Sequence, residues 1–290
     1  HAMRIACRPF DFEHMVLSHG WVFLAPFQWD EKRHILRRRF VIEGQAIDVE
    51  FSYHRHKGEA VVCCNSGSRL SSDAQKAVRL AARRMFWLDF DFSDLWDMCR
   101  ADAELGYVFR RRCGGMLRSP TAFEDIIKTV CTTNCDWRNT KRMCEGLCSL
   151  QGGAFPDPVT ILQVSAASLR SRTSMGYRAR TVRTVAAQWV EGKMPIDEWA
   201  RAKDFERIRA CLRQIWGIGD YCLNHILVLL GDFSRIPVDN EVLHYLRHSH
   251  FEGAPVDEKE AIQPYRGFGQ YQYIAYKFRR IARRLNYIDK

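Results

Sequence analysis

Apolar and polar residues follow a strand-like pattern from residue 9 to about residue 65. The stretches GWVFLAPFQW, ILRRRFVIEGQAIDVEFSYH and GEAVVCCN are rich in β-branched and aromatic residues, with partial alternation and glycine between runs. Between two of these runs, the glycine of Glu43-Gly44-Gln45 indicates a tight turn. The pattern therefore predicts an antiparallel sheet that contains a hairpin at these residues.

From Ser71 onward the apolar period changes to about 3.6 residues, which predicts helices. SSDAQKAVRLAARRMFWL starts with a Ser/Asp cap, and SPTAFEDIIKTVCTTN starts with Ser-Pro-Thr and an acidic first turn. TILQVSAASLRSRTSMGYRARTVRTVAAQWVEG predicts two helices that break at Met175 and Gly176. We expect an α+β fold: an antiparallel β-rich N-terminal domain (1–85), then a mostly α-helical body (86–290). His1, Ala2 and Met3 are typical of an expression remnant and are set aside.

The stretch LRQIWGIGDYCLNHILVLLG predicts a helical hairpin over about residues 204–230. Gly217 and Gly219 flank Ile218, and glycines permit a positive φ and a close approach of backbone to a ligand. The second helix begins near Asp220, so its free N–H groups could hold a phosphate. A plain structural corner between two helices is the alternative.

The composition and charge of the chain indicate what kind of partner it binds. The chain carries a net charge of +10, no apolar run long enough to span a membrane, and 47% hydrophobic residues. The positive charge is clustered, as in residues 37–39, 110–112, 170–183 and 279–284. Such clusters favour a polyanion, either nucleic acid or an anionic membrane, and charge alone does not choose between them.

The cysteines indicate a reducing compartment. An odd number, 11, without a secretory leader predicts reduced thiols in an intracellular protein, in the bacterial cytoplasm or nucleoid or in a nucleus. Cys131, Cys135, Cys144 and Cys148 pair at a spacing of four residues. This spacing favours packing on helices over a zinc site, which stays the alternative.

Twenty residues after Gly219, Pro237, Val238 and Asp239 precede an amphipathic helix, where Asp239 is expected to be the N-cap. The combination LRQIWGIGDYCLNHILVLLG…IPVDNEV resembles the helix-hairpin-helix, Gly/Pro-rich loop and aspartate of the HhH-GPD superfamily of DNA glycosylases. RCGGMLRSPTAFEDIIKTVCTTN, TSMGYRARTVRTVAAQWVEG and QPYRGFGQYQYIAYKF resemble segments of its alkylpurine and 8-oxoguanine branches. The resemblance covers most of residues 9–287, most securely 118–245.

This resemblance implies a catalytic role for Asp239. In the family, the aspartate stabilises the positive charge that builds on the sugar as the base leaves, and it assists the attack of water. Tyr221 occupies the position where bifunctional members carry a lysine that forms a Schiff base. Because a tyrosine cannot form an imine, the resemblance implies a monofunctional enzyme without AP-lyase activity.

The resemblance also implies roles for further residues. The base pocket is expected to include Trp216, Tyr221, His225, Gln270 and Ile274. The DNA wedge and the reader of the opposite base are expected to be Asn134, Tyr177 and Arg178. Phosphate contacts are expected from Gly217, Gly219 and Arg180. Main-chain oxygens of Arg213, Ile215 and Ile218 would hold a structural Na⁺ or K⁺ ion, and no cofactor is required.

Several of these residues have an equally plain structural interpretation. Asn134 could be a helix C-cap, and Tyr177 with Arg178 could form a simple Gly-Tyr turn beside a solvated arginine. His225, as a lone helical histidine, is more often packed or hydrogen-bonded. Ile274 lies where the 8-oxoguanine branch has an aromatic ring, which weakens the assignment to that branch.

The expected protein is a monomeric base-excision DNA glycosylase that acts on double-stranded DNA with a damaged base. It would rotate the damaged nucleotide into its pocket and hydrolyse the N-glycosidic bond. An alkylated purine such as 3-methyladenine is the first expected substrate, because the leaving base is already cationic and aromatic rings attract cations. The alternatives are 8-oxoguanine, uracil or thymine mismatches, and a non-catalytic helix-hairpin-helix DNA-binding protein.

Overall fold

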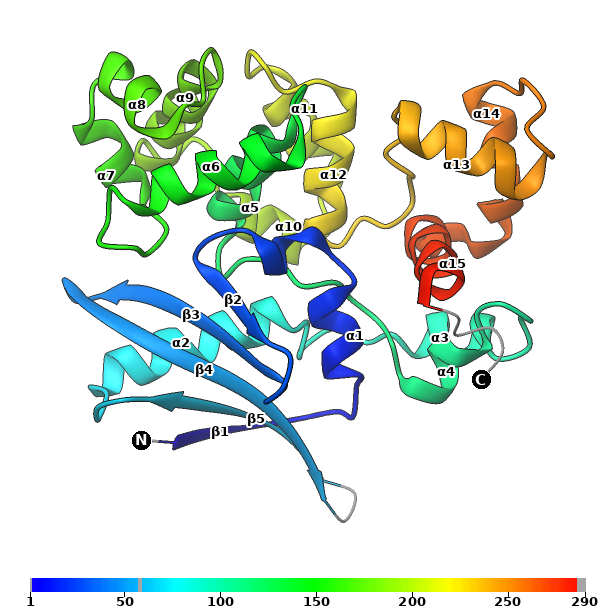
Figure 1. The fold of residues 1–290 in the computed structure, drawn as a ribbon, viewed down its shortest axis with the longest axis horizontal. Helices are drawn as coiled ribbons and strands as arrows, with labels where there is room; N and C mark the ends of the chain where they lie inside the picture. Colours follow the sequence, from blue (N-terminus) through cyan, green and yellow to red (C-terminus); the bar gives the residue numbers. More distant parts are fainter. Residues whose placement is uncertain (1, 57–58, 286–290) are drawn as a thin grey trace. The chain divides into compact units, whose positions relative to one another are not determined.

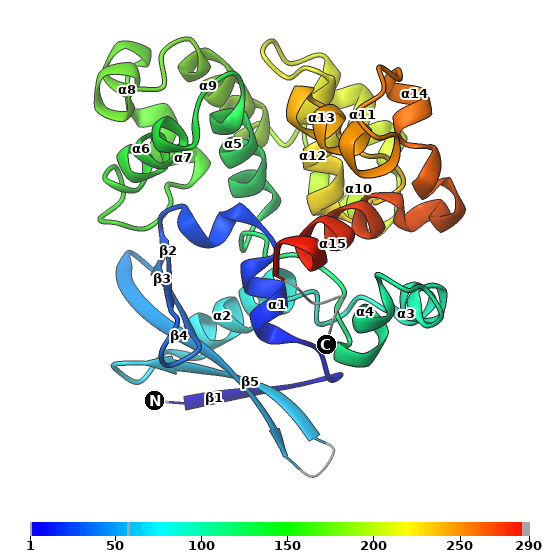
Figure 2. The same ribbon diagram turned by 45° about the vertical axis from the view of Figure 1, so that its right-hand side comes forward.

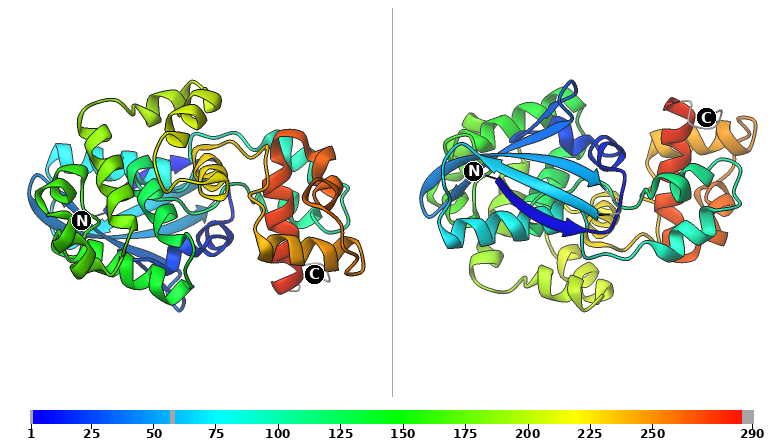
Figure 3. Two further views of the ribbon diagram at one scale, coloured as in Figure 1. Left: turned by 90° about the horizontal axis from the view of Figure 1, so that it is seen from above. Right: turned by 90° about the horizontal axis from the view of Figure 1, so that it is seen from below.

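The computed structural model of the chain describes residues 2–56 and 59–285, and it begins with a five-stranded antiparallel sheet (Figure 1). The strands are β1 (Ala2–Cys7), β2 (Phe27–Asp30), β3 (Ile35–Ile42), β4 (Gln45–His56) and β5 (Glu59–Ser66). Their order across the sheet is β1-β5-β4-β3-β2, and Figure 3 shows them from above and below. With the helices that follow, this sheet makes the fold α+β, as the sequence predicts.

The predicted hairpin is confirmed. Ile42 pairs with Gln45, and the two residues between them, Glu43 and Gly44, have φ values of +53° and +74°. Positive φ at both central residues gives a two-residue turn whose twist matches that of the flanking strands.

The first strand was not predicted. Ala2 and Met3, which the sequence analysis set aside, pair with Asn65 and Cys64 of β5, so setting them aside was wrong. Met3 and Ile5 are buried while their neighbours are exposed, which gives this edge strand the ordinary alternation of a half-buried strand.

Packing divides the chain into two compact units, formed by His1–Asp91 with Gly115–Pro195 and by Phe92–Gly114 with Ile196–Lys290. The sequence-based boundary at residue 85 falls at the last residue of α2, inside unit 1. Unit 1 adds these helices to the sheet: α1 (Phe12–Leu17), η1 (Gly20–Phe23), α2 (Ser72–Met85), α5 (Ala122–Thr132), α6 (Trp137–Cys148), α7 (Pro158–Gln163), α8 (Ala166–Thr173) and α9 (Arg178–Val190). Figures 1 and 2 show α2 along the sheet. The ring centroid of Phe86, at the end of α2, lies 5.6 Å from that of Phe51 in β4.

The segment from residue 160 to residue 192 contains one more break between helices than the sequence predicted. The break near Met175 and Gly176 is confirmed, because Ser174 and Gly176 have positive φ values. A second break ends α7 at Gln163, and Ser165 then caps α8 by accepting a hydrogen bond from the Ser168 N–H. The structure therefore has three helices where the sequence predicted two.

A buried ionic cluster fixes the sheet to the helices of unit 1. Arg38 of β3 donates two hydrogen bonds to Glu124 of α5, at 2.9 and 2.6 Å, and Lys128 Nζ lies 2.8 Å from the same carboxylate. Burial acts to raise the pKa of Glu124, but Arg38 and Lys128 lower it to about 2. The carboxylate is therefore charged at neutral pH and holds β3 against α5.

Unit 2 contains α3 (Ser93–Cys99), α4 (Gly106–Arg111), α10 (Ile196–Arg201), α11 (Phe205–Arg213), α12 (Asp220–Leu230), α13 (Asn240–His250), α14 (Glu258–Ala261), η2 (Gln263–Tyr271) and α15 (Gln272–Leu285). The first segment of unit 2, residues 92–114, is fixed to α15. Tyr107 donates a hydrogen bond to the Phe278 carbonyl at 3.0 Å, and Arg279 forms an ion pair with Asp102 at 2.6 Å. Over the described part of the chain, no helix is both long and apolar enough to cross a membrane.

Candidate functional site

A tight turn joins α11 to α12 in unit 2. Gly217 has a φ of +89°, a conformation that favours glycine. Ile218 is buried and donates its N–H to the Ile215 carbonyl at 3.1 Å, so it anchors the turn in the core. Gly219 is the N-cap of α12 without a side-chain cap, and a Cβ built there would meet nothing within 4 Å. The first N–H groups of α12 are thus accessible to an anion.

The same turn presents the three main-chain oxygens predicted to hold a cation. The Ile215 oxygen already accepts the Ile218 N–H. Over residues 2–56 and 59–285, no hydrogen bond ends on the carbonyl oxygen of Arg213 or Ile218. Unpaired carbonyl oxygens are the ligands that hard cations prefer, so the residues fit a Na⁺ or K⁺ ion.

Asp239 is the N-cap of α13, as predicted from the sequence. One carboxylate oxygen accepts a hydrogen bond from the Val242 N–H at 2.7 Å, and the side chain is half-buried. No group in the described ranges donates to the other carboxylate oxygen. One oxygen therefore fixes the orientation of the side chain, while the second is left for a ligand.

Tyr221 of α12 and Tyr276 of α15 lie in the electrostatic field of Asp239. Burial, followed by the charge of Asp239, raises the pKa of Tyr221 to about 12. Burial is also the largest cause of the raised pKa of Tyr276, to which Asp239 contributes. Both phenols stay protonated at neutral pH and can donate hydrogen bonds next to the carboxylate.

His225 lies one turn after Tyr221 on α12, with the two rings nearly parallel and their centroids 6.1 Å apart. The residue is half-buried in the structure. Burial, together with the positive charge of Lys277, lowers the pKa of His225 to about 3. The imidazole is therefore neutral at physiological pH and adds no charge to the site.

The remaining predicted pocket residues differ in their exposure to solvent. Trp216 is 50% exposed on the hairpin turn, and Gln270 is exposed on η2. Ile274 has no exposed surface and packs in the core of unit 2. The contact of Ile274 with a base stays a prediction, since reaching it would need movement of its neighbours.

Sequence reasoning missed a tyrosine cluster around α15. The ring of Tyr276 lies 5.9 Å from Tyr245, 5.8 Å from Tyr265 and 6.0 Å from Tyr273. Arg280 donates to the Tyr276 hydroxyl at 3.1 Å. Tyr273, Tyr276 and Arg280 recur at i, i+3 and i+7, a spacing that puts them on one face of a helix and was the available signal.

In unit 1 the three predicted wedge residues come together at the end of α5. Asn134, two residues after the end of α5, has a φ of +46° and donates to the Tyr177 hydroxyl at 3.4 Å. Tyr177 is 47% exposed, as a wedge must be. Arg178 is buried and donates from Nε to the Thr133 carbonyl at 3.1 Å and from Nη2 to the Asn134 carbonyl at 3.2 Å. Arg178 thus holds the two loops together, and its contact with an opposite base stays a prediction.

No protein-family model matches the chain, and no curated protein matches its sequence. Solved structures do match over nearly the whole chain. A 3-methyladenine DNA glycosylase from Archaeoglobus fulgidus superposes with a TM-score of 0.74 at 18% identity, covering 97% of this chain and 98% of that one.

The chain has the fold of DNA glycosylases. The Clostridium acetobutylicum 8-oxoguanine glycosylase/lyase, in complex with DNA that has cytosine opposite 8-oxoguanine, gives a TM-score of 0.67 at 16% identity and covers 98% of both chains. A Schizosaccharomyces pombe 3-methyladenine DNA glycosylase in complex with abasic DNA gives 0.51 at 16% identity, covering 65% of this chain and 95% of that one. At such identities the similarity establishes the fold.

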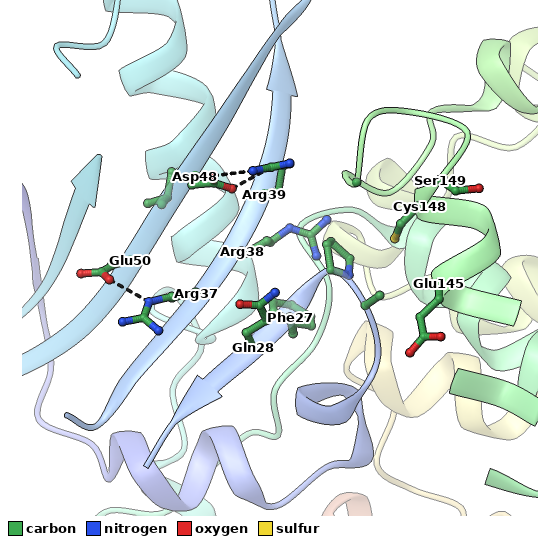
Figure 4. Close-up of a pocket in the computed structure, with 14 residues that line it drawn as sticks. Phe27, Gln28, Arg37, Arg38, Arg39, Asp48, Glu50, Glu145, Cys148 and Ser149 are labelled. Carbon is green, nitrogen blue, oxygen red and sulfur yellow. Dashed lines mark hydrogen bonds and ion pairs between the residues drawn. The ribbon is translucent and has the colours of Figure 1, made fainter. Parts of the chain in front are cut away.

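A separate hollow in unit 1, shown in Figure 4, has a volume of about 630 Å³ and lies between β2, β3, β4 and α6. The three arginines that line it are each paired with a carboxylate: Arg37 with Glu50, Arg38 with Glu124 and Arg39 with Asp48. None of the predicted site residues lines it. Because its guanidinium groups are already neutralised by carboxylates, the hollow is a poor site for an anion.

Proposed function

We propose that this protein is a monofunctional base-excision DNA glycosylase that hydrolyses the N-glycosidic bond of a damaged base in duplex DNA. The observation that carries the proposal is the Asp239 carboxylate, fixed at the start of α13 through one oxygen and open at the other. The likeness in fold to glycosylases over 97% of the chain supports it.

Asp239 would act on the sugar. As the base departs, positive charge builds on the sugar ring, and a fixed negative charge nearby lowers the energy of this oxocarbenium-like state. The bond from the Val242 N–H holds the carboxylate in place before the reaction, so little reorganisation is needed. The Tyr221 hydroxyl, protonated beside it, can orient water or the departing base.

The absence of lyase activity is part of the proposal. Strand cleavage by these enzymes needs an amine that forms a Schiff base, and a phenol at position 221 cannot form one. One of the structural neighbours is a glycosylase/lyase, so the chemistry of this residue, rather than the fold, supports the distinction.

An alkylated purine such as 3-methyladenine is the proposed substrate. Tyr221, Tyr276 and the exposed Trp216 supply aromatic rings, which attract a cationic base. The fold is also that of 3-methyladenine glycosylases. The second candidate is 8-oxoguanine, because the amide of Gln270 is exposed and free to read a purine edge.

Each unit would supply contacts of its own to DNA. The open start of α12 at Gly217 and Gly219 would bind a phosphate, and Arg180 another. Tyr177 would fill the gap left in the stack by the rotated nucleotide, with Asn134 beside it. A Na⁺ or K⁺ ion at the hairpin oxygens would stiffen the turn, and the protein would act as a monomer.

A panel of lesion duplexes tests the proposal. Wild type would be incubated with duplexes that carry 3-methyladenine, 8-oxoguanine, uracil or a thymine mismatch, and free base would be measured. Release of a base, with strand breakage only after alkali, is the expected result. Breakage without alkali would contradict the role of Tyr221. No release from any duplex, combined with tight DNA binding, would point to a non-catalytic DNA-binding protein.

A further inference from the structure

Two exposed aromatic side chains of unit 1 have no role in the proposed function. Phe23 is 56% exposed at the end of η1, and Trp137 is 39% exposed at the start of α6. The other exposed large aromatic residues over the described ranges are Tyr177 and Trp216, which the proposed function already places against DNA. Phe23 and Trp137 are therefore the aromatic surface that remains to be explained.

Phe23 and Trp137 belong to one small platform with Gly20 and Lys141. A Cβ built on Gly20 would lie 2.7 Å from Cη2 of Trp137, so the indole ring packs directly on the glycine of η1. Lys141, one turn after Trp137 on α6, places its Nζ 5.5 Å from the centre of the Phe23 ring. The glycine thus holds the indole in place while leaving over a third of the residue's surface exposed.

The platform adjoins basic residues and the proposed wedge. Arg138, Lys141 and Arg142 lie in the first half of α6, whereas Asp136, the nearest acid along the chain, caps the helix by accepting the Asn139 N–H at 2.7 Å. Asn134 is only three residues before Trp137 and contacts Tyr177. An aromatic surface with a positive rim therefore begins where the DNA stack would be interrupted.

We propose that Phe23 and Trp137 form a second base-stacking platform, which takes a base of the opposite strand that is left unpaired beside, and not directly across from, the damaged nucleotide. This inference rests on the DNA interface of the proposed function. Aromatic rings stack on any base through its π face, and lysine and arginine neutralise the adjoining phosphates. A protein partner fits less well, since three of the five residues that follow Trp137 on α6 are basic: Arg138, Lys141 and Arg142.

DNA binding without chemistry tests this proposal. Two duplexes would carry a stable abasic-site analogue, one fully paired elsewhere and one with an extra unpaired adenine beside the analogue in the opposite strand. Because stacking of one base on an aromatic residue strengthens binding by about 5- to 150-fold, wild type should prefer the second duplex by at least about 5-fold. Trp137→Ala should lose this preference and Trp137→Phe should keep most of it.

Leu80→Ala is the matched control, because Leu80 is an exposed apolar residue on α2 of the same unit. It should keep the preference. If Trp137→Ala fails to fold, Phe23→Ala gives the same test from the other ring. A preference that survives in both alanine variants overturns the platform, as does tight binding of both duplexes by wild type without any preference. Failure of wild type to bind either duplex would instead overturn the proposed function itself.

Discussion

Arg178 offers a sharp test of whether the wedge is held by a buried side chain. Its guanidinium donates to the carbonyls of Thr133 and Asn134, at the end of α5 where the last carbonyls have no partner within the helix. Arg178→Met keeps the unbranched stem and removes every donor. The two carbonyls would then lose these bonds, which lie in a partly buried position.

The expected loss follows from these contacts. A hydrogen bond from a charged group contributes about 1.5–3 kcal/mol, and a positive charge near a helix C-terminus adds about 0.3–1 kcal/mol. The two acceptors are adjacent and share one donor group, so their contributions are not additive. We expect Arg178→Met to lower the free energy of unfolding by about 2–4 kcal/mol.

Urea unfolding monitored by circular dichroism measures this loss, with Arg180→Met as the control. Arg180 is an exposed residue of the same helix, so its replacement should change the free energy of unfolding by less than about 0.5 kcal/mol. Arg180→Met should instead weaken DNA binding through a lost phosphate contact. If Arg178→Met unfolds within about 0.5 kcal/mol of wild type, the guanidinium does not hold the wedge.

Three further predictions concern unit 2. Tyr221→Lys would place an amine beside Asp239, so borohydride should trap a covalent complex with abasic DNA in the variant; trapping in wild type would contradict the monofunctional assignment. His225 has a folded-state pKa of about 3, below its unfolded value, so its contribution to stability is complete above about pH 6.5 and is lost as the pH falls. Between pH 6 and 4.5, the free energy of unfolding of wild type, measured by urea titration, should therefore fall by about 1.4 kcal/mol per pH unit more than that of His225→Gln. Equal pH dependence of the two proteins would refute the burial of the ring. Gly219→Ala has room for its Cβ, so its free energy of unfolding should lie within about 0.5 kcal/mol of the wild-type value. The added methyl group should nevertheless weaken DNA binding in a fluorescence titration. An unchanged affinity would show that this turn does not bind a phosphate.

The sequence predicted those elements whose signals are local. The turn at Glu43 and Gly44 was predictable because a glycine between two strand-like runs indicates a tight turn, and Gly44 does adopt a positive φ there. The cap at Asp239 was predictable because an aspartate before an amphipathic helix satisfies free N–H groups. Each of these features depends on residues within a few positions of one another.

Features that depend on distant segments were not predicted. β1 depends on pairing with β5, about 60 residues later, and the short stretch that includes Met3 has no turn signal around it. Tyr276 joins the site only because α15 packs beside the loop of Asp239 within unit 2. The burial of Arg178 depends on carbonyls of a helix 45 residues earlier, so the sequence alone left a solvated arginine as an alternative.

The central claim is that the Asp239 carboxylate stabilises the departing base's sugar, and single-turnover base release tests it most directly. Asp239→Asn keeps an oxygen that can accept the Val242 N–H, and asparagine is as good an N-cap as aspartate, so the variant should unfold within about 0.5 kcal/mol of wild type. On the duplex from which wild type releases the base fastest, we predict that Asp239→Asn releases it at least about 100-fold more slowly. A folded Asp239→Asn variant that releases the base at the wild-type rate would contradict it.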